Sequence, residues 1–166
     1  MILVAVGTYI HGFDELVAAA DQAAARLDLT GLAQIGHSRR LPRHLRWERF
    51  LAPSVLAARM AAARIVICHG GIGLLGEAMR AGKPIIAMPR RGRPSRSSPA
   101  GDQSALLQRL AERHPIRICR HPDELTSILQ AVARCGFVPQ RYDLGSDIPE
   151  IVASFLDRHG RPSQRA

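Results

Sequence analysis

Residues 64–91 read RIVICHGGIGLLGEAMRAGKPIIAMPRR, and this stretch decides the fold. An apolar run at 65–68 leads into glycines, a helix-like segment follows at 73–81, and a second apolar run covers 85–88. A strand, a glycine turn and a helix in this order bring unpaired backbone N–H groups and the positive end of a helix dipole together. The stretch therefore predicts a turn that can bind phosphate, although the same glycines could serve only to make a tight turn.

Within it, residues 71–76 read GIGLLG, which has the GxGxxG spacing of dinucleotide-binding turns. Arg90 and Arg91 follow the next strand, where the 2′-phosphate of NADP could lie. Against an NADP site, that pattern normally follows the first strand of its fold, and the first turn here reads GTYIHGF. Glu77 also lies just inside the helix, where its carboxylate could accept two ribose hydroxyls or complement the helix N-terminus.

Outward from this stretch, strand-like and helix-like segments alternate, which predicts an α/β fold. We expect a Rossmann-like, mostly parallel sheet with helices on both faces. The expected strands are 1–6, 32–35, 65–68, 85–88 and 116–119, with a possible brief one at 50–51. The expected helices are 13–27, 53–63, 73–81, 103–113, 122–134 and 148–158. One domain is expected over 1–159, with a flexible tail at 160–166 and a basic loop at 90–101.

Composition limits the partners of the chain. The net charge is +9, Lys83 is the only lysine among 23 basic residues, and this arginine-rich balance fits phosphate, carboxylate or an anionic membrane surface. Aromatic residues make up only 4%, which disfavours a protein that stacks nucleic-acid bases. The three cysteines and seven histidines lack metal-ligand spacing, so no metal is expected. No secretion-signal pattern is visible, and no apolar run approaches the ~20 residues that span a bilayer.

Several motifs together resemble a known family. HGGIGLLGEAMRAGKPIIAMPR, at 69–90, is similar to the donor-site signature of the C-terminal half of family 28 glycosyltransferases. The opening MILVAVGT, the following FDEL and the QIGHS at 34–38 are similar to the small catalytic subunits of two-subunit members. Those members include an exopolysaccharide glucuronosyltransferase and a dolichol-linked N-acetylglucosamine transferase. The resemblance covers about residues 1–134.

The resemblance implies a donor-binding half of GT-B fold and a role for individual residues. It implies that the HGGIG turn presents backbone N–H groups to the diphosphate of a UDP-sugar, through His69, Gly70, Gly71, Ile72 and Gly73. Glu77 matches the residue that binds the ribose hydroxyls, and Gln103 matches one that contacts the sugar. The other implied donor contacts are Gly7, Thr8, Phe50, Leu51, Arg90 and Asp102.

The chain departs from the family pattern in several places, two of which concern expected donor contacts. Leu74 stands where the family commonly has Ser or Thr, which removes one hydroxyl contact to phosphate. Residues 101–103 read Gly-Asp-Gln where the family often has Asp-His-Gln, so the role of Asp102 is open. Elsewhere, Arg90, Arg91, Arg93 and Arg96 follow the strand that ends at Met88, where a sugar carboxylate could be bound.

The resemblance implies an inverting glycosyltransferase subunit that uses UDP-glucuronate or UDP-N-acetylglucosamine to extend a lipid-linked glycan in polysaccharide biosynthesis. It also implies a membrane-attached partner subunit that supplies the acceptor site, and a cytoplasmic chain held at the inner face of the membrane. No Asp-x-Asp occurs, so no metal or other cofactor is expected. The general base is expected in the missing half; His11 is the candidate within this chain. An NADP-binding oxidoreductase domain and a non-catalytic arginine-rich polyanion-binding module remain alternatives.

Overall fold

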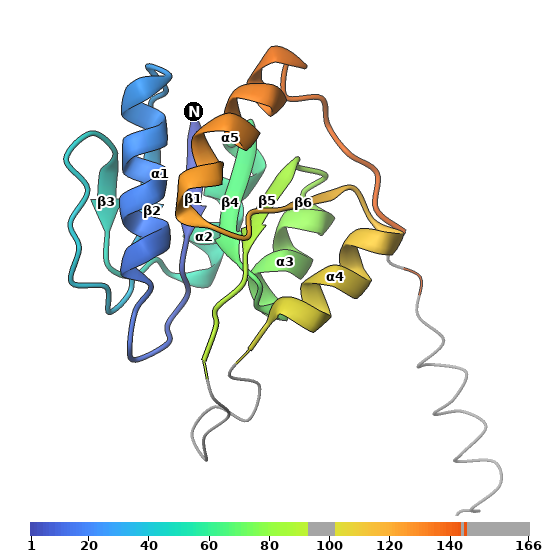
Figure 1. Ribbon diagram of the computed structural model, residues 1–166, viewed down its shortest axis with the longest axis horizontal. Helices are drawn as coiled ribbons and strands as arrows, with labels where there is room; N and C mark the ends of the chain where they lie inside the picture. The colour runs from blue at the N-terminus through green and yellow to red at the C-terminus, as the bar shows by residue number, and fades with distance from the viewer. Residues whose placement is uncertain (93–101, 144, 146–166) are drawn as a thin grey trace, which may run out of the picture.

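The structure is a computed structural model that describes residues 1–92, 102–143 and 145. Its strands are β1 (Ile2–Ala5), β2 (Gly31–Gln34), β3 (Arg46–Glu48), β4 (Ile65–His69), β5 (Ile85–Met88) and β6 (Ile116–Ile118). Its helices are α1 (Asp14–Arg26), α2 (Pro53–Ala62), α3 (Ile72–Arg80), α4 (Ser104–Arg113) and α5 (Leu125–Arg134), the last preceded by the 3₁₀ turn η1 (Pro122–Glu124). Strands and helices alternate along this part of the chain, except that β3 follows β2 with no helix between them (Figure 1).

The six strands form one parallel sheet in the order β3-β2-β1-β4-β5-β6. β1 lies centrally, with Leu3 opposite Leu32 on one side and Val66 on the other. The chain moves outward to β3 and then returns beside β1, so the direction of winding reverses between β1 and β4. The expected Rossmann-like class is confirmed. In such sheets ligands bind beyond the carboxyl ends of the strands at this reversal.

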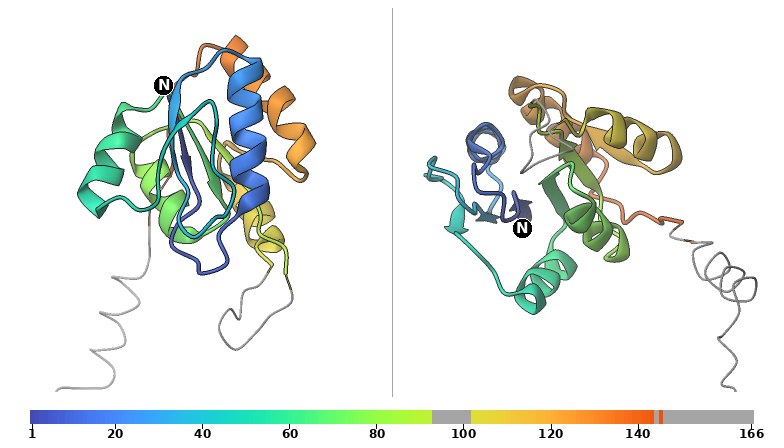
Figure 2. Two further views of the ribbon diagram at one scale, coloured as in Figure 1. Left: turned by 90° about the vertical axis from the view of Figure 1, so that its left-hand side faces the viewer. Right: turned by 90° about the horizontal axis from the view of Figure 1, so that it is seen from below.

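Two hydrophobic cores cover the two faces of the sheet. On one face α1 and α5 pack against alternate strand residues such as Val4, Ile67 and Ile86. On the other face α2, α3 and α4 pack against residues such as Ala5 and Val66. The right-hand view in Figure 2 shows α1 and α5 on the opposite side of the sheet from α2 and α3. Because β1, β4 and β5 are buried on both faces, they read as continuous apolar runs.

One strand was not predicted, and one predicted strand is absent. β3 reads RWE and is exposed along its length, so it carries no apolar signal; its pairing with β2 makes it a strand. Phe50 and Leu51, expected as a possible strand, lie in the connection between β3 and α2. The expected helix at 148–158, the tail at 160–166 and most of the basic loop lie outside the described residues.

Candidate functional site

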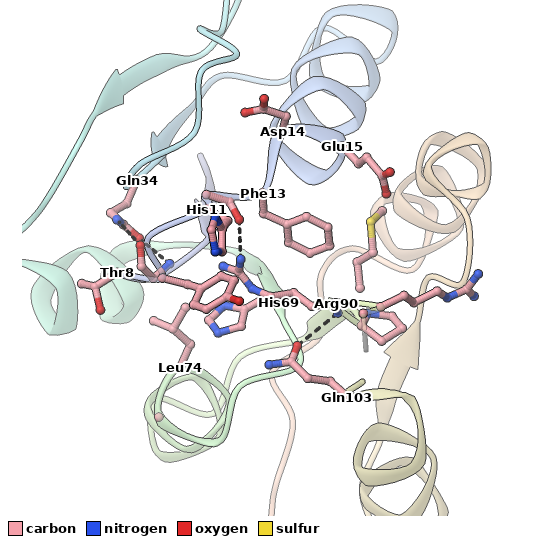
Figure 3. A pocket seen from close by; sticks show the side chains of 18 of the residues that line it. Thr8, His11, Phe13, Asp14, Glu15, Gln34, His69, Leu74, Arg90 and Gln103 are labelled. Atoms are coloured by element: carbon pink, nitrogen blue, oxygen red, sulfur yellow. Dashed lines mark hydrogen bonds between the residues drawn. The ribbon is translucent and has the colours of Figure 1, made fainter. Parts of the chain in front are cut away.

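A cleft of about 1180 Å³ lies at the carboxyl ends of the strands. Its walls come from the connections that follow β1, β3, β4, β5 and β6, so segments far apart in sequence meet there (Figure 3). The residues expected at a donor site that line this cleft are Gly7, Thr8, His11, Phe50, Leu51, His69, Gly73, Glu77, Arg90 and Gln103.

The first turn of α3 leaves backbone donors free at this cleft. Gly71 is the N-cap, no side chain caps the helix, and Leu75 N–H makes the first helical hydrogen bond, to Gly71 O at 3.1 Å. The N–H groups of the preceding helical residues have no partner within the helix, and the helix dipole adds partial positive charge beside them. This end of α3 can therefore hold an anionic group.

Three glycines at the start of α3 differ in what occupies the space beside them. A Cβ on Gly70 would lie 2.7 Å from Leu107 Cδ1, so this glycine allows α4 to pack closely. A Cβ on Gly71 would lie 2.3 Å from His69 Nε2, so this glycine makes room for the imidazole. Gly73 has no atom within 4 Å of an added Cβ, and it lines the cleft. Of the three, Gly73 alone leaves open space where a ligand can approach the backbone.

Three expected contacts from this turn do not reach the cleft wall. Gly70 and Gly71 are used in packing, as described above, and Ile72 is 62% exposed without lining the cleft. Sequence spacing could not separate these positions, because every residue of the turn shares the same pattern while only part of the turn faces the cleft.

Glu77 lies one turn into α3 and faces the cleft. Its Oε1 accepts a hydrogen bond from Arg80 Nη2 at 2.6 Å, and both side chains are substantially exposed. An exposed ion pair of this kind contributes little to stability, so the carboxylate can exchange its partner at small cost. Glu77 is thus available to accept hydroxyl groups of a ligand bound at the start of α3.

The imidazole of His69 is wedged between the two glycine turns. A Cβ on Gly7 would lie 2.9 Å from His69 Cε1, so the ring is close to Gly7 as well as to Gly71. Burial, together with the charge of Arg90, lowers the pKa of His69 to about 4, against a smaller raising effect of the Ala5 carbonyl. The ring is therefore neutral near pH 7 and acts as a spacer between the turns that follow β1 and β4.

The turn after β1 is held by groups from the β2 side of the sheet. Gln34, which is buried, accepts from Gly7 N–H at 2.9 Å and donates to Gly7 O at 3.0 Å. The buried hydroxyl of Ser38 accepts from Phe13 N–H at 2.8 Å, just before α1 begins. Gln34 lines the cleft but was not predicted as a site residue; its place in QIGHS, at the end of a strand, was the available signal.

Arg90 lies across the same turn from the β5 side. Its Nη1 donates to Gly12 O and its Nη2 to Val6 O. Its guanidinium lies over the rings of Tyr9, at 4.9 Å, and Phe13, at 5.0 Å. Figure 3 shows its side chain between Phe13 and His69. Expected as a direct contact to phosphate or sugar, Arg90 instead has two of its donors committed to the protein backbone.

Gln103 and Asp102 form the junction between β5 and α4. Arg90 N–H donates to Gln103 Oε1 at 3.1 Å, and Gln103 N–H donates to Arg90 O at 3.0 Å. Asp102 Oδ1 accepts from Ser104 N–H at 2.7 Å, and hydrogen bonds from the Ser104 hydroxyl and N–H lower the pKa of Asp102. Asp102 does not line the cleft; its carboxylate serves the start of α4 instead.

The remaining expected residues form the outer wall of the cleft. Phe50 is 46% exposed and meets the His37 ring edge-on at 5.0 Å. His11, also exposed, packs edge-on against Tyr9 at 5.2 Å. Sequence reasoning assigned no site role to five further residues that line the cleft, namely Tyr9, Phe13, Leu56, Arg120 and His121. Phe13 opens the FDEL motif, whereas Leu56, inside α2, and Arg120 and His121, after β6, belong to no recognised motif.

Within the described residues, no group of three His, Cys, Asp or Glu side chains is arranged to hold a metal ion. None of the helices in the same part of the chain is long and apolar enough to cross a membrane.

Comparison with known proteins agrees with this arrangement. Residues 1–132 match the family described as glycosyltransferase family 28 C-terminal domain. No match was found among curated proteins. The fold is similar to that of CalG4, the calicheamicin glycosyltransferase, with 26% identity and a TM-score of 0.58 over 80% of this chain and 34% of that one.

Two other solved structures share the fold. Acinetobacter baumannii MurG has 16% identity and a TM-score of 0.60, over 95% of this chain and 49% of that one. The glycosyltransferase VinC, solved in complex with DTDP, has 21% identity and a TM-score of 0.55, over 82% and 34%. This chain therefore spans a third to a half of the length of these three proteins.

Proposed function

The chain belongs to the family of glycosyltransferase family 28 C-terminal domains, and from this premise we propose that it binds the UDP-sugar donor of an inverting glycosyltransferase. The observation that carries the proposal is the open space at Gly73, beside the uncapped start of α3 and the exchangeable carboxylate of Glu77. VinC, whose fold is similar, was solved in complex with the nucleoside diphosphate DTDP, which supports a nucleotide ligand for this chain.

In this proposal the diphosphate lies at the N-terminus of α3, the ribose at Glu77 and the uracil beside Phe50 and Leu51. Negative charge grows on the departing UDP as the bond to the sugar breaks. Fixed N–H groups and the helix dipole stabilise that charge without reorganising, which is the property that lowers the barrier. The base that deprotonates the acceptor hydroxyl is expected from an acceptor-binding half, with His11 as the candidate within this chain.

The structure weakens the NADP alternative. That interpretation used Arg90 and Arg91 to bind a 2′-phosphate, but Arg90 is tied to Val6 O and Gly12 O, which leaves only Arg91 of the two for that role. It also places the glycine pattern after the first strand, whereas the pattern here follows β4 and runs into α3. A non-catalytic polyanion-binding module would bind any polyanion with strong salt dependence, and it would show no preference for UDP.

Replacing Glu77 by alanine is expected to weaken UDP binding by at least tenfold. The change removes two hydrogen bonds from ribose hydroxyls to a charged carboxylate, each worth on the order of 1.5–3 kcal/mol. Calorimetric titration of UDP against the wild type and the variant measures the difference.

Arg80→Ala is the matched control, because it breaks the Glu77–Arg80 ion pair and leaves the carboxylate in place. It should bind UDP at least as well as the wild type. Equal UDP affinity for Glu77→Ala and wild type would contradict the ribose role. Wild-type protein that binds NADP but not UDP would instead support the dinucleotide alternative.

The proposal extends to the identity of the sugar that the UDP donor carries. Arg91 and Arg120 line the cleft near Gln103, and Arg91 Nη2 donates to Arg120 O at 2.9 Å. Guanidinium groups pair well with a carboxylate, so we propose UDP-glucuronate ahead of UDP-N-acetylglucosamine. Titrating both sugars and UDP in one series tests this order. Arg93 and Arg96, which the sequence also suggests for binding a sugar carboxylate, lie outside the described residues.

We further propose a membrane-attached partner subunit that supplies the binding site for a lipid-linked glycan acceptor. Exposed apolar side chains around the cleft support a surface there for binding a partner protein: Ile10 is 64% exposed, Phe50 46% and Val55 42%. All three lie on segments at the carboxyl end of the sheet. We expect the purified chain to bind UDP without transferring sugar to a lipid-linked acceptor. Full turnover by the chain alone, followed with a radiolabelled donor, would contradict the need for a partner.

A further inference from the structure

We infer that Arg90 is a positioning residue, which holds the loop at residues 7–12 in the shape that forms one wall of the donor cleft. The inference rests on the proposed function for the identity of the cleft as a donor site. The contacts of Arg90 with the loop lie within this chain. The loop connects β1 to α1 and displays Thr8 and His11 to the cleft. Arg90 comes from the end of β5, roughly eighty residues further along the chain.

The guanidinium joins both ends of the loop. Its Nη2 donates to Val6 O, where β1 has just ended, and its Nη1 donates to Gly12 O, just before α1 begins. Between these points the Cζ atom of the group lies over the rings of Tyr9 and Phe13. A planar fork with several fixed donors can make both hydrogen bonds and stack at once, whereas a lysine ammonium cannot.

The base of the Arg90 side chain is itself fixed. Its backbone N–H and C=O both bond to Gln103, at the start of α4. On the other side, Gln34 bonds to Gly7, the first residue of the loop, and Ser38 bonds to Phe13, which follows the loop. The loop is therefore held between the β2 side and the β5 side of the sheet, and Arg90 makes the side-chain link on the β5 side.

A direct role in ligand binding would need guanidinium donors that face the cleft. Two donors are committed to backbone carbonyls, and Nε is buried without a partner among the described residues. Nδ1 of the neighbouring His69 is buried and unpartnered in the same way. Two of the five guanidinium donors thus bond the two ends of the loop, and holding the loop is the role that the geometry assigns to Arg90.

The experiment compares wild type, Arg90→Lys and Arg90→Gln by amide hydrogen exchange, followed by NMR, and by UDP calorimetry. We expect exchange of the hydrogen-bonded amides of Gly7, Gly12 and Phe13 to rise on the order of tenfold or more in both variants, because charge-assisted hydrogen bonds at both ends of the loop are lost. UDP affinity should stay within about twofold, because the contacts proposed for UDP come from α3 and from Phe50 and Leu51, outside this loop. Arg113→Gln, an exposed arginine at the end of α4, should change neither quantity.

Imidazole titration gives a second readout that separates charge from geometry. Because Arg90 lowers the pKa of His69, Arg90→Gln should raise that pKa, whereas Arg90→Lys should leave it nearer the wild-type value. Unchanged loop protection in Arg90→Lys would overturn the inference, since geometry would then not matter. Loss of folding in both variants, or loop protection kept while UDP affinity falls, would also overturn it. If wild type binds no UDP, the proposed function fails, whereas the exchange result still decides the role of Arg90.

Discussion

Gly73→Ala is expected to weaken UDP binding by about ten- to a hundredfold, equivalent to roughly 1.4–2.7 kcal/mol. An added Cβ meets no protein atom within 4 Å, so the fold has room for it, and the space that it fills is open to the cleft. A phosphate that approaches the backbone N–H groups of α3 would be displaced by this methyl group. The measurement is UDP titration by calorimetry, together with denaturant unfolding of the same variant.

Gly76→Ala is the matched control, because it makes the same substitution one turn later in the same helix. Its Cβ would lie 3.5 Å from Arg80 Nη1, an ordinary contact, and it does not line the cleft. Alanine is favoured over glycine inside helices by roughly 0.5–1 kcal/mol, so neither variant should be less stable than wild type. If both variants bind UDP as wild type does, the start of α3 is not the phosphate site.

Gly73 also shows where sequence reasoning succeeds and where it stops. Continuous apolar runs and a strand–glycine–helix order locate β4, α3 and β5, because two-sided burial leaves a direct mark on composition. The separate tasks of Gly70, Gly71 and Gly73 cannot be predicted this way. Each depends on what would meet a side chain at that position: α4 at Gly70, His69 at Gly71 and no atom within 4 Å at Gly73.

The same limit applies to β3 and Arg90. β3 carries no apolar signal because all three of its residues are exposed, and the neighbouring strand β2 determines its conformation. Arg90 was predicted to lie at the cleft, and it does line the cleft. Its bonds to Val6 O and Gly12 O could not be predicted, because contacts between residues so far apart leave no spacing to detect.

The hydrogen bonds from Arg90 fix the loop at residues 7–12 on one side only. The packing of Gly12 shows how the loop is held on the other side. Gly12 has φ +62, a left-handed conformation that L side chains rarely adopt, and an added Cβ would lie 2.4 Å from Ser38 N. The loop is therefore packed against the backbone after β2 with no space between them. Its shape depends on this close approach on one side and on Arg90 on the other.

Gly12→Ala is expected to lower the free energy of unfolding by roughly 2–5 kcal/mol, measured by denaturant unfolding. The left-handed backbone costs an alanine about 1–2 kcal/mol, and forcing a methyl group into a packed contact costs typically 1–3 kcal/mol more. Gly136→Ala separates the two effects, because Gly136 has φ +75 but nothing within 4 Å of an added Cβ. It should show only the backbone cost. If the two variants lose equal stability, the backbone at Ser38 yields to the methyl group, and the loop at the cleft is not tightly packed on that side.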